Sequence, residues 1–272
     1  MKNTEKKDED LVKIVQPLVD WYRENKRDLP WRHNPDAYRV WISEIMLQQT
    51  RVEAVKGYYD RFLKALPTVK DLAEAEEDKL LKLWEGLGYY NRVRNMQKAA
   101  QQIMVDHEGI FPDTYEEILQ LKGIGNYTAG AISAFAYGIP KPAVDGNVLR
   151  VISRITGSYE DIMKQSVRKK IENTLEQVIP SDAASDFNQG LIELGAIVCV
   201  PNGEPKCELC PVKEYCIACT ENLTAEIPVK KKAKARKIEE RTILIFKDGK
   251  QIAIRKRPAK GLLAGLYEFP NV

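Results

Sequence analysis

Apolar residues recur at helical spacing through most of the chain, from Leu11 to Cys199. Two clear stripes are Tyr38, Trp41, Ile42, Ile45 and Met46, and Phe187, Leu191, Leu194 and Val198. Side chains three or four positions apart share one face of a helix, so each stripe predicts a helix packed on a core. Proline and glycine interrupt the pattern at Leu29-Pro30, Leu66-Pro67, 86–88, 109–112 and 139–142. The pattern therefore predicts a mainly α fold of many short helices.

The pattern changes toward the end of the chain. Residues 220–241 have few large apolar side chains and include the basic run VKKKAKARK, which is typical of a linker. The following stretch, RTILIFKDGKQIAIRKR, consists of two β-rich runs around Asp248-Gly249, which predicts a hairpin. We therefore expect a helical region at 1–219, a linker at 220–241, and a β-containing unit at 242–272. Because the sequence stops at Val272, we expect this last unit to be incomplete.

Composition limits the chemistry that the chain can perform. The 272 residues are 44% hydrophobic and 30% charged, as in a soluble globular protein. The N-terminal stretch MKNTEKKDED is too charged for a signal peptide, and no apolar run could cross a membrane, so a cytoplasmic protein is expected. A net charge of +3 does not by itself indicate a polyanionic partner. With two histidines in the chain, catalysis falls to carboxylates or cysteines.

All five cysteines lie in CVPNGEPKCELCPVKEYCIAC, at positions 199, 207, 210, 216 and 219. Cytoplasmic thiols stay reduced, so a metal explains this cluster better than disulfides do. Zinc could use the pairs Cys207/Cys210 and Cys216/Cys219. An iron–sulfur cluster could instead use Cys199, Cys207, Cys210 and Cys216. The residues alone leave these alternatives nearly equal.

The stretch LKGIGNYTAGAI places Gly123 and Gly125 just before an apolar helical run. Unpaired N–H groups at a helix N-terminus attract anions, and glycines let a phosphate approach them. For an isolated pair of glycines, a tight turn between packed helices is the commoner explanation.

Two carboxylates are candidates for catalysis. In VWISEIMLQQTRV, Glu44 lies off the apolar stripe and Gln48 follows one turn later, so both can face one cleft. In KPAVDGNVLRVISR, Asp145 precedes a helical run. A solvated glutamate and a helix N-cap are the alternative interpretations. Cleavage of a glycosidic bond requires such a pair, one carboxyl protonated to assist the leaving group and one ionised to stabilise the cationic sugar.

The motifs LPWR, SEIMLQQTRV, LGYYNRVRN, LKGIGNYTAGAI, VDGN and FNQGLIELGA, with the cysteine loop, resemble the adenine DNA glycosylases of the MutY type, in the helix-hairpin-helix superfamily. They follow the family order over nearly the whole chain. The resemblance implies a six-helix barrel at about 30–140 with its hairpin near 114–137. It also implies an iron–sulfur module made of the N-terminal helix and 141–219, and the start of a Nudix-like 8-oxoguanine-reading domain at 242–272. Gly123 and Gly125 would then grip a DNA phosphate.

Family roles carry over to matching positions. Glu44 would protonate the flipped adenine and later activate water, Asp145 would stabilise the oxocarbenium ion or bond to it, and Asn147 would orient the site. Tyr127 stands where the endonuclease III type carries a nucleophilic lysine. A phenol cannot form a Schiff base, which implies simple hydrolysis, with Tyr127 near the Asp145 carboxylate.

The resemblance also assigns residues that contact the base, the duplex and the metal. Adenine-pocket positions are Arg27, Trp31, Arg32, Leu47 and Gln189, with Gln48 beside them; Gln49 and Tyr89 would wedge into the duplex. A [4Fe–4S] cluster would be held by Cys199, Cys207, Cys210 and Cys216, although the first gap is one residue longer than usual and Cys219 is additional.

The partner implied by the resemblance is double-stranded DNA with adenine opposite 8-oxoguanine or guanine, bound by a monomer in a bacterial cytoplasm, at the nucleoid. The alternatives are an endonuclease III-like glycosylase/lyase and a non-catalytic iron–sulfur DNA-binding module.

Overall fold

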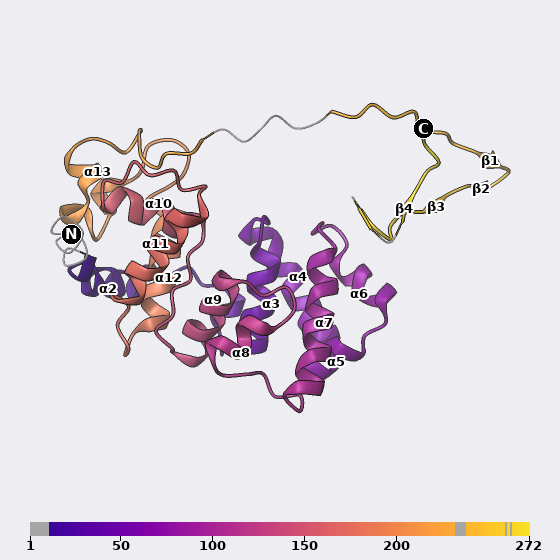
Figure 1. Cartoon of the computed structure of the whole chain (residues 1–272), viewed down its shortest axis with the longest axis horizontal. Coiled ribbons are helices and arrows are strands. Elements are labelled where there is room, and N and C mark those ends of the chain that lie inside the picture. Colours follow the sequence, from indigo (N-terminus) through magenta and orange to yellow (C-terminus); the bar gives the residue numbers. More distant parts are fainter. Residues whose placement is uncertain (1–10, 232–237, 259, 262) are drawn as a thin grey trace.

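A computed structural model describes residues 11–231, 238–258, 260–261 and 263–272. Its first helices are α2 (Val15–Asn25), the 3₁₀ turn η1 (Pro30–Arg32), α3 (Ala37–Leu47), α4 (Val52–Ala65), α5 (Val69–Glu74), α6 (Glu77–Trp84) and α7 (Asn91–Asp106). They are followed by α8 (Tyr115–Gln120), α9 (Asn126–Tyr137), α10 (Gly146–Ile155), α11 (Gln165–Glu176), α12 (Ala184–Ile197), η2 (Cys207–Leu209), η3 (Lys213–Tyr215) and α13 (Ile217–Thr220). The predicted fold of many short helices is confirmed (Figure 1).

Local side-chain caps set where several helices begin. Asp36 accepts a hydrogen bond from the Arg39 amide at the start of α3, and Thr68 forms a capping box at the start of α5. Thr114 and Asp145 cap α8 and α10 in the same way. Each cap satisfies amides that have no partner within the helix, so these boundaries follow from local sequence.

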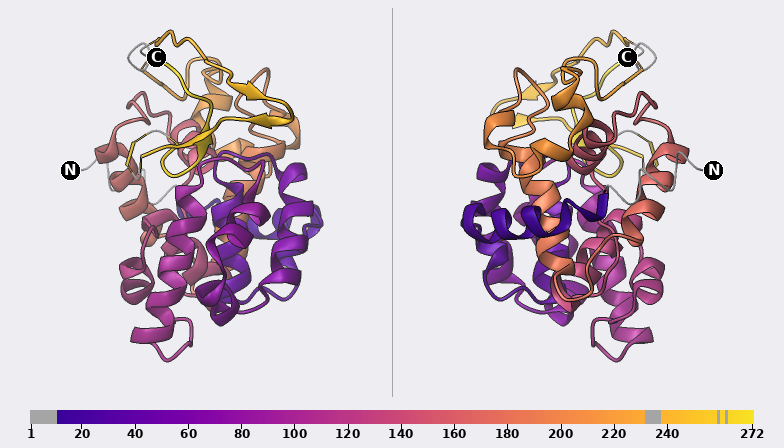
Figure 2. Two further views of the ribbon diagram at one scale, coloured as in Figure 1. Left: turned by 90° about the vertical axis from the view of Figure 1, so that its right-hand side faces the viewer. Right: turned by 90° about the vertical axis from the view of Figure 1, so that its left-hand side faces the viewer.

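The buried side chains form two hydrophobic clusters. The first, drawn from residues 29–132, contains the stripe that begins at Tyr38. The second contains the stripe that begins at Phe187 and combines residues 11–19 with residues 144–227. Helix α2 therefore packs against α12, far from it in sequence, and Figure 2 shows the indigo α2 crossing the orange α12. Helices α3, α9 and α12 meet where the two clusters adjoin.

Helices α8 and α9 form a helix-hairpin-helix around residues 121–125. Gly123 has φ +79°, and a Cβ there would lie 2.8 Å from the Asn95 Cβ, so both backbone and space require glycine. Gly125 is the N-cap residue of α9, and a Cβ there would meet nothing within 4 Å. The hairpin therefore presents open space at the helix N-terminus.

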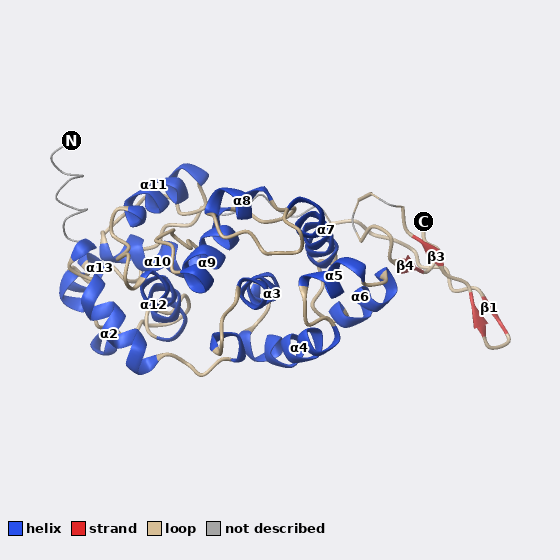
Figure 3. Ribbon diagram, turned by 90° about the horizontal axis from the view of Figure 1, so that it is seen from below, coloured by secondary structure: helices blue, strands red, loops and turns tan. Residues whose placement is uncertain are grey.

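The last segment is a pair of two-stranded antiparallel ribbons, set apart from the helical body in Figures 1 and 3. Strand β1 (Lys247–Asp248) pairs with β2 (Gln251–Ile252) around the predicted turn, which confirms the hairpin, and β3 (Arg255–Lys256) pairs with β4 (Tyr267–Glu268). Its large exposed apolar side chains are Ile243, Ile245, Phe246, Ile252, Ile254, Leu263, Tyr267, Phe269 and Val272. Arg94 Nη1 joins the segment to α7 by donating to the Ala264 carbonyl at 3.1 Å.

Of the basic run from Lys230 to Lys237, residues 232–237 lie outside the part of the chain that the structure describes. None of the helices that the structure describes is both long and apolar enough to cross a bilayer.

Candidate active site

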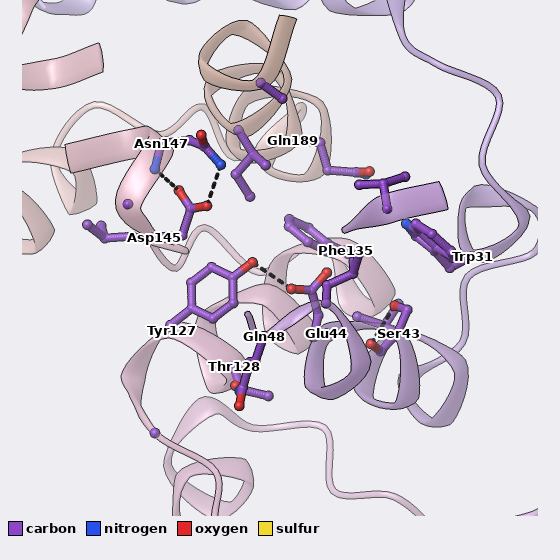
Figure 4. Close-up of a pocket in the computed structure, with 18 of the residues that line it drawn as sticks. Trp31, Ser43, Glu44, Gln48, Tyr127, Thr128, Phe135, Asp145, Asn147 and Gln189 are labelled. Atoms are coloured by element: carbon purple, nitrogen blue, oxygen red, sulfur yellow. Dashed lines mark hydrogen bonds between the residues drawn. The ribbon is translucent and has the colours of Figure 1, made fainter. Parts of the chain in front are cut away.

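A cavity of about 1080 Å³ opens where the two hydrophobic clusters adjoin, and its walls come from α3, α9, α10 and α12 (Figure 4). The sequence-predicted residues that line it are Arg27, Trp31, Arg32, Glu44, Leu47, Gln48, Gln49, Gly123, Gly125, Tyr127, Asp145, Asn147 and Gln189. Tyr89 does not line the cavity and is 67% exposed. Predicted site residues as far apart in the sequence as Arg27 and Gln189 therefore line the same cavity.

Glu44 projects from α3 into this cavity and is 6% exposed, so the solvated-glutamate interpretation is wrong. The Tyr127 hydroxyl donates to Glu44 Oε2 at 2.5 Å. Burial raises the pKa of Glu44 to about 7; the Tyr127 hydrogen bond opposes this shift and the negative charge of Asp145 adds to it. Glu44 therefore retains a proton to near neutral pH and can act as a general acid there.

Asp145 is the N-cap of α10, which confirms that interpretation. It also lines the cavity, so its catalytic role stays a prediction. Its Oδ1 accepts hydrogen bonds from the amides of Asn147 and Val148, each at 2.8 Å, and its Oδ2 accepts one from Asn147 Nδ2 at 2.7 Å. Burial is the larger effect and raises the pKa of Asp145 above its ordinary value, while these hydrogen bonds and the charge of Arg150 oppose the rise. Three donors stabilise the ionised form, which suits Asp145 to face a developing positive charge.

Tyr127 lies between the two carboxylates in Figure 4, near Asp145 as expected, and its hydroxyl donates a hydrogen bond to Glu44. The Asp145 oxygens are already engaged by donors of α10, whereas α9 packs alongside α3. Burial and the two nearby carboxylates raise the pKa of Tyr127, so the phenol stays protonated. Tyr127 is thus a hydrogen-bond donor to the proposed acid.

Arg150 holds Asn147 in place and was not singled out from the sequence. Its Nη2 donates to Asn147 Oδ1 at 2.9 Å and to the Gly195 carbonyl at 2.8 Å, and its Nε donates to the Cys199 carbonyl at 2.8 Å. A Cβ on Gly195 would lie 2.5 Å from the Asn147 Cβ, so α12 approaches α10 this closely only with glycine. An arginine inside the apolar run VLRVISR was the available signal.

Glu193 is the second residue that sequence reasoning missed, and it organises the predicted base pocket. Its carboxylate is fully buried and accepts from Arg27 Nε at 2.7 Å and Arg32 Nη2 at 2.8 Å. Burial alone would raise the pKa of Glu193, but these arginines lower it to about 2. Arg32 Nε also donates to Gln189 Oε1 at 3.2 Å. A carboxylate one turn after Gln189 on an apolar helix face was the signal.

The burial of Glu44 predicts a pH-dependent stability. Its folded pKa of about 7 exceeds the value of 4.5 expected when exposed, so the folded state binds the proton more tightly and loses stability as pH rises from 4.5 through 7. Glu44→Gln removes this loss and should raise the free energy of unfolding at pH 8 by on the order of 3 kcal/mol. At pH 4.5 the gain should nearly vanish. Thermal unfolding at pH 4.5 and pH 8 measures this change in stability, with Glu24→Gln at an exposed position as the control. An equal gain at the two pH values would contradict a raised pKa of Glu44.

The five cysteines are free and line a second pocket, together with Arg154, Lys213 and Thr224. Arg154 Nη1 donates to Cys199 Sγ at 3.2 Å, and its other nitrogens bond to the carbonyls of Thr224 and Ile227. In the part of the chain that the structure describes, no three His, Cys, Asp or Glu side chains converge as on a single metal ion. A four-iron cluster spreads its thiolates over four irons, so ligands distributed around one pocket fit its chemistry.

Hydrolysis of a glycosidic bond uses two carboxyl groups in one site. Glu44 and Asp145 line one cavity, which Gly123 and Gly125 of the hairpin also line. Such a cavity in a helical body with this hairpin defines the class of helix-hairpin-helix DNA glycosylases. Residues 42–179 match the HhH-GPD superfamily of base excision DNA repair proteins. The chain belongs to the adenine DNA glycosylase family within this superfamily.

Sequence relatives support this membership, and a solved structure supports the fold. The chain is 39% identical to the adenine DNA glycosylase of Buchnera aphidicola (Acyrthosiphon pisum), over 94% of this chain and 73% of that protein. It is 38% identical to the adenine DNA glycosylase of Arabidopsis thaliana, over 96% of this chain and 47% of that protein. The solved structure of a thermostable thymine-DNA glycosylase is 30% identical, with a TM-score of 0.70 over 80% of this chain and 99% of that one.

Proposed function

We propose that this protein removes adenine paired with 8-oxoguanine or guanine in duplex DNA by hydrolysis, without cutting the strand. The observation that carries the proposal is the pair formed by Glu44, whose pKa is raised to about 7, and the hydrogen-bonded Asp145 in one cavity. The names of the curated relatives support adenine as the base.

The residues suggest how the base is released. A flipped adenine enters between Trp31 and Leu47, and Glu44 donates its proton to a ring nitrogen of the base. The electron pair of the glycosidic bond then passes to the base, and the ionised Asp145 stabilises the oxocarbenium ion that remains. Water adds to the sugar carbon and gives a proton back to the Glu44 carboxylate, which restores the acid.

The cavity favours hydrolysis over a lyase reaction. A lyase needs an amine that attacks the sugar, and the described residues that line the cavity include no lysine. By the resemblance, Tyr127 stands where the endonuclease III type carries its nucleophilic lysine, and its hydroxyl donates a hydrogen bond to Glu44.

The test of the proposed function is base release from four duplexes, with adenine opposite 8-oxoguanine, guanine, cytosine or thymine. We expect adenine release opposite 8-oxoguanine and guanine, little release opposite thymine, and strand breaks only after alkali treatment. Breaks without alkali would favour the endonuclease III-like alternative. Binding without release would favour a non-catalytic module.

We also propose that Cys199, Cys207, Cys210 and Cys216 hold a [4Fe–4S] cluster. These thiolates, from the loop after α12 to the end of η3, would hold the cluster, which would tie this part of the chain together. Arg154 supports this loop by holding the Cys199 sulfur and the carbonyls beyond α13. Cys219 lines the same pocket but is left outside the ligand set.

The ligand set gives a prediction that separates its members from the fifth thiol. Cys210→Ser should lose the broad visible absorbance and most of the iron, because it removes one of four thiolates. The matched variant Cys219→Ser should keep both. Iron analysis of protein purified without oxygen measures the difference. Stoichiometric zinc with no iron, or equal iron loss in the two variants, would overturn the assignment.

We further propose that 1–219 form the catalytic region, with a linker at 220–241 and the start of a Nudix-like 8-oxoguanine-reading domain at 242–272. The exposed apolar side chains of the last segment support a separate role for it. The packed region continues somewhat past residue 219, because Ile227 is buried in the second cluster.

A further inference from the structure

Arg92, in the first turn of α7, joins two segments that are far apart in the sequence. Its Nη1 donates to the carbonyls of Ile45 and Gln48, both at 2.7 Å. Its Nη2 donates to the carbonyls of Leu87 and Gly88, at 2.9 and 3.3 Å. Each of these acceptors is a main-chain oxygen, so the guanidinium holds backbone rather than neutralising a carboxylate.

The first segment is the end of α3. The last carbonyls of a helix have no intrahelical partner, and Arg92 supplies donors to two of them. Directly after the C-cap residue Gln48, Gln49 has φ +60°. A non-glycine residue in this left-handed region persists only when its surroundings hold it there.

The second segment connects α6 to α7, and it too contains a non-glycine residue with a positive φ. Tyr89 has φ +46° and is 67% exposed, so its ring projects from a strained backbone. The Gly88 carbonyl accepts from Trp84 Nε1 at 3.0 Å as well as from Arg92. The guanidinium also lies 5.3 Å from the Trp84 ring and 5.8 Å from the Tyr89 ring.

Arginine suits this role because its planar fork directs donors along fixed, divergent lines and keeps its charge when partly buried. Nη1 donates to the end of α3 next to Gln49, here called the Gln49 segment. Nη2 donates to the connection between α6 and α7 that contains Tyr89, here called the Tyr89 segment. Lysine at this position would carry the same charge at one point and could not reach both segments at once.

We propose that Arg92 is a positioning residue that clamps the Gln49 and Tyr89 segments at a fixed separation, so that both side chains enter the duplex together when the target base leaves the stack. This inference rests on the proposed function. Arg92 lies outside the cavity that holds Glu44 and Asp145, so its loss should slow extrusion of the base and leave the bond-breaking step unchanged.

The test compares Arg92→Lys with Lys98→Gln, an exposed control on the same helix. Extrusion is followed by the fluorescence of 2-aminopurine placed at the target position. Base release is followed under single turnover on a normal A:8-oxoguanine duplex and on one whose neighbouring pair is mismatched and already partly unstacked. Arg92→Lys should slow extrusion and release about tenfold or more on the normal duplex, and less than about threefold on the loosened one. Equal losses on both duplexes would overturn the proposal.

Amide hydrogen exchange tests the clamp without any reaction. In Arg92→Lys, exchange should accelerate in residues 48–50 and 86–90 together, with the rest of α3 and α7 unchanged. Acceleration in only one segment would contradict a clamp. If the unsubstituted protein released no adenine from either duplex, the proposed function would fail, whereas this measurement would still decide whether Arg92 holds both segments.

A double-mutant cycle covers the case in which Arg92→Lys does not fold. Because clamped segments act as one unit, Gln49→Ala combined with Tyr89→Ala should slow release little more than the stronger single variant. Additive losses would mean that the two side chains act independently, and the clamp would be wrong.

Discussion

Glu44→Gln is expected to abolish measurable base release while duplex binding is retained. Adenine is a poor leaving group unless its ring is protonated, and Glu44 is the buried carboxyl whose pKa is raised to about 7 in the cavity. Glutamine keeps the shape and still accepts the hydrogen bond from Tyr127, but its amide has no acidic proton to transfer to the base. General acid catalysis contributes roughly 10² to 10⁴-fold, and the second role in water activation should place the loss at or beyond the upper end.

Single-turnover kinetics and a binding assay on the same duplex measure this effect. Glu24→Gln, at an exposed position of α2, is the matched control and should change neither quantity. The protonated fraction of Glu44 also falls as pH rises through its pKa of about 7, so release by the unsubstituted protein should slow above that pH. A loss of less than about tenfold in Glu44→Gln would remove this residue from the acid role.

The second large effect is expected for Asp145→Asn. Asparagine caps helices about as well as aspartate, so α10 should remain intact while the negative charge proposed to face the sugar is lost. Removal of one group that stabilises transition-state charge typically costs about 10² to 10³-fold, and a full charge in a buried site should cost at least that.

The control for this variant is Asp36→Asn, which changes the equivalent N-cap of α3, at a residue that does not line the cavity. Both variants should keep their helix content by circular dichroism, and only Asp145→Asn should lose base release under single turnover. Similar losses in the two variants would mean that Asp145 serves α10 as a cap and contributes nothing further to the reaction.

The roles proposed for the two carboxylates depend on burial and hydrogen bonding. Glu44 accepts one side-chain hydrogen bond, from Tyr127, whereas Asp145 accepts three at the start of α10. Burial raises the pKa of both carboxyls, but two backbone amides and the Asn147 side chain oppose the rise at Asp145, whereas at Glu44 a single hydrogen bond, from Tyr127, does so. Neither property is visible in the sequence motifs that contain them.

The sequence by itself determined the features that depend on neighbours along the chain. Helical spacing identified the buried stripes, proline and glycine marked where helices end, and Asp248-Gly249 located the hairpin. The N-cap position of Asp145 was also readable, because a cap bonds to amides two and three residues later. These features follow local rules of backbone geometry and hydrogen bonding.

Only the tertiary structure decided the contacts between distant residues. The Tyr127 hydroxyl donates to Glu44, 83 positions away in the sequence. The local sequence around Glu193 and Arg92 does not reveal their partners. Glu193 binds arginines more than 160 positions earlier, and Arg92 bonds to a segment about 45 positions earlier. Their partners depend on how α12 packs against α2 and how α7 meets the end of α3. Burial and long-range hydrogen bonds, which set both pKa values and positioning, exist only once the helices have packed.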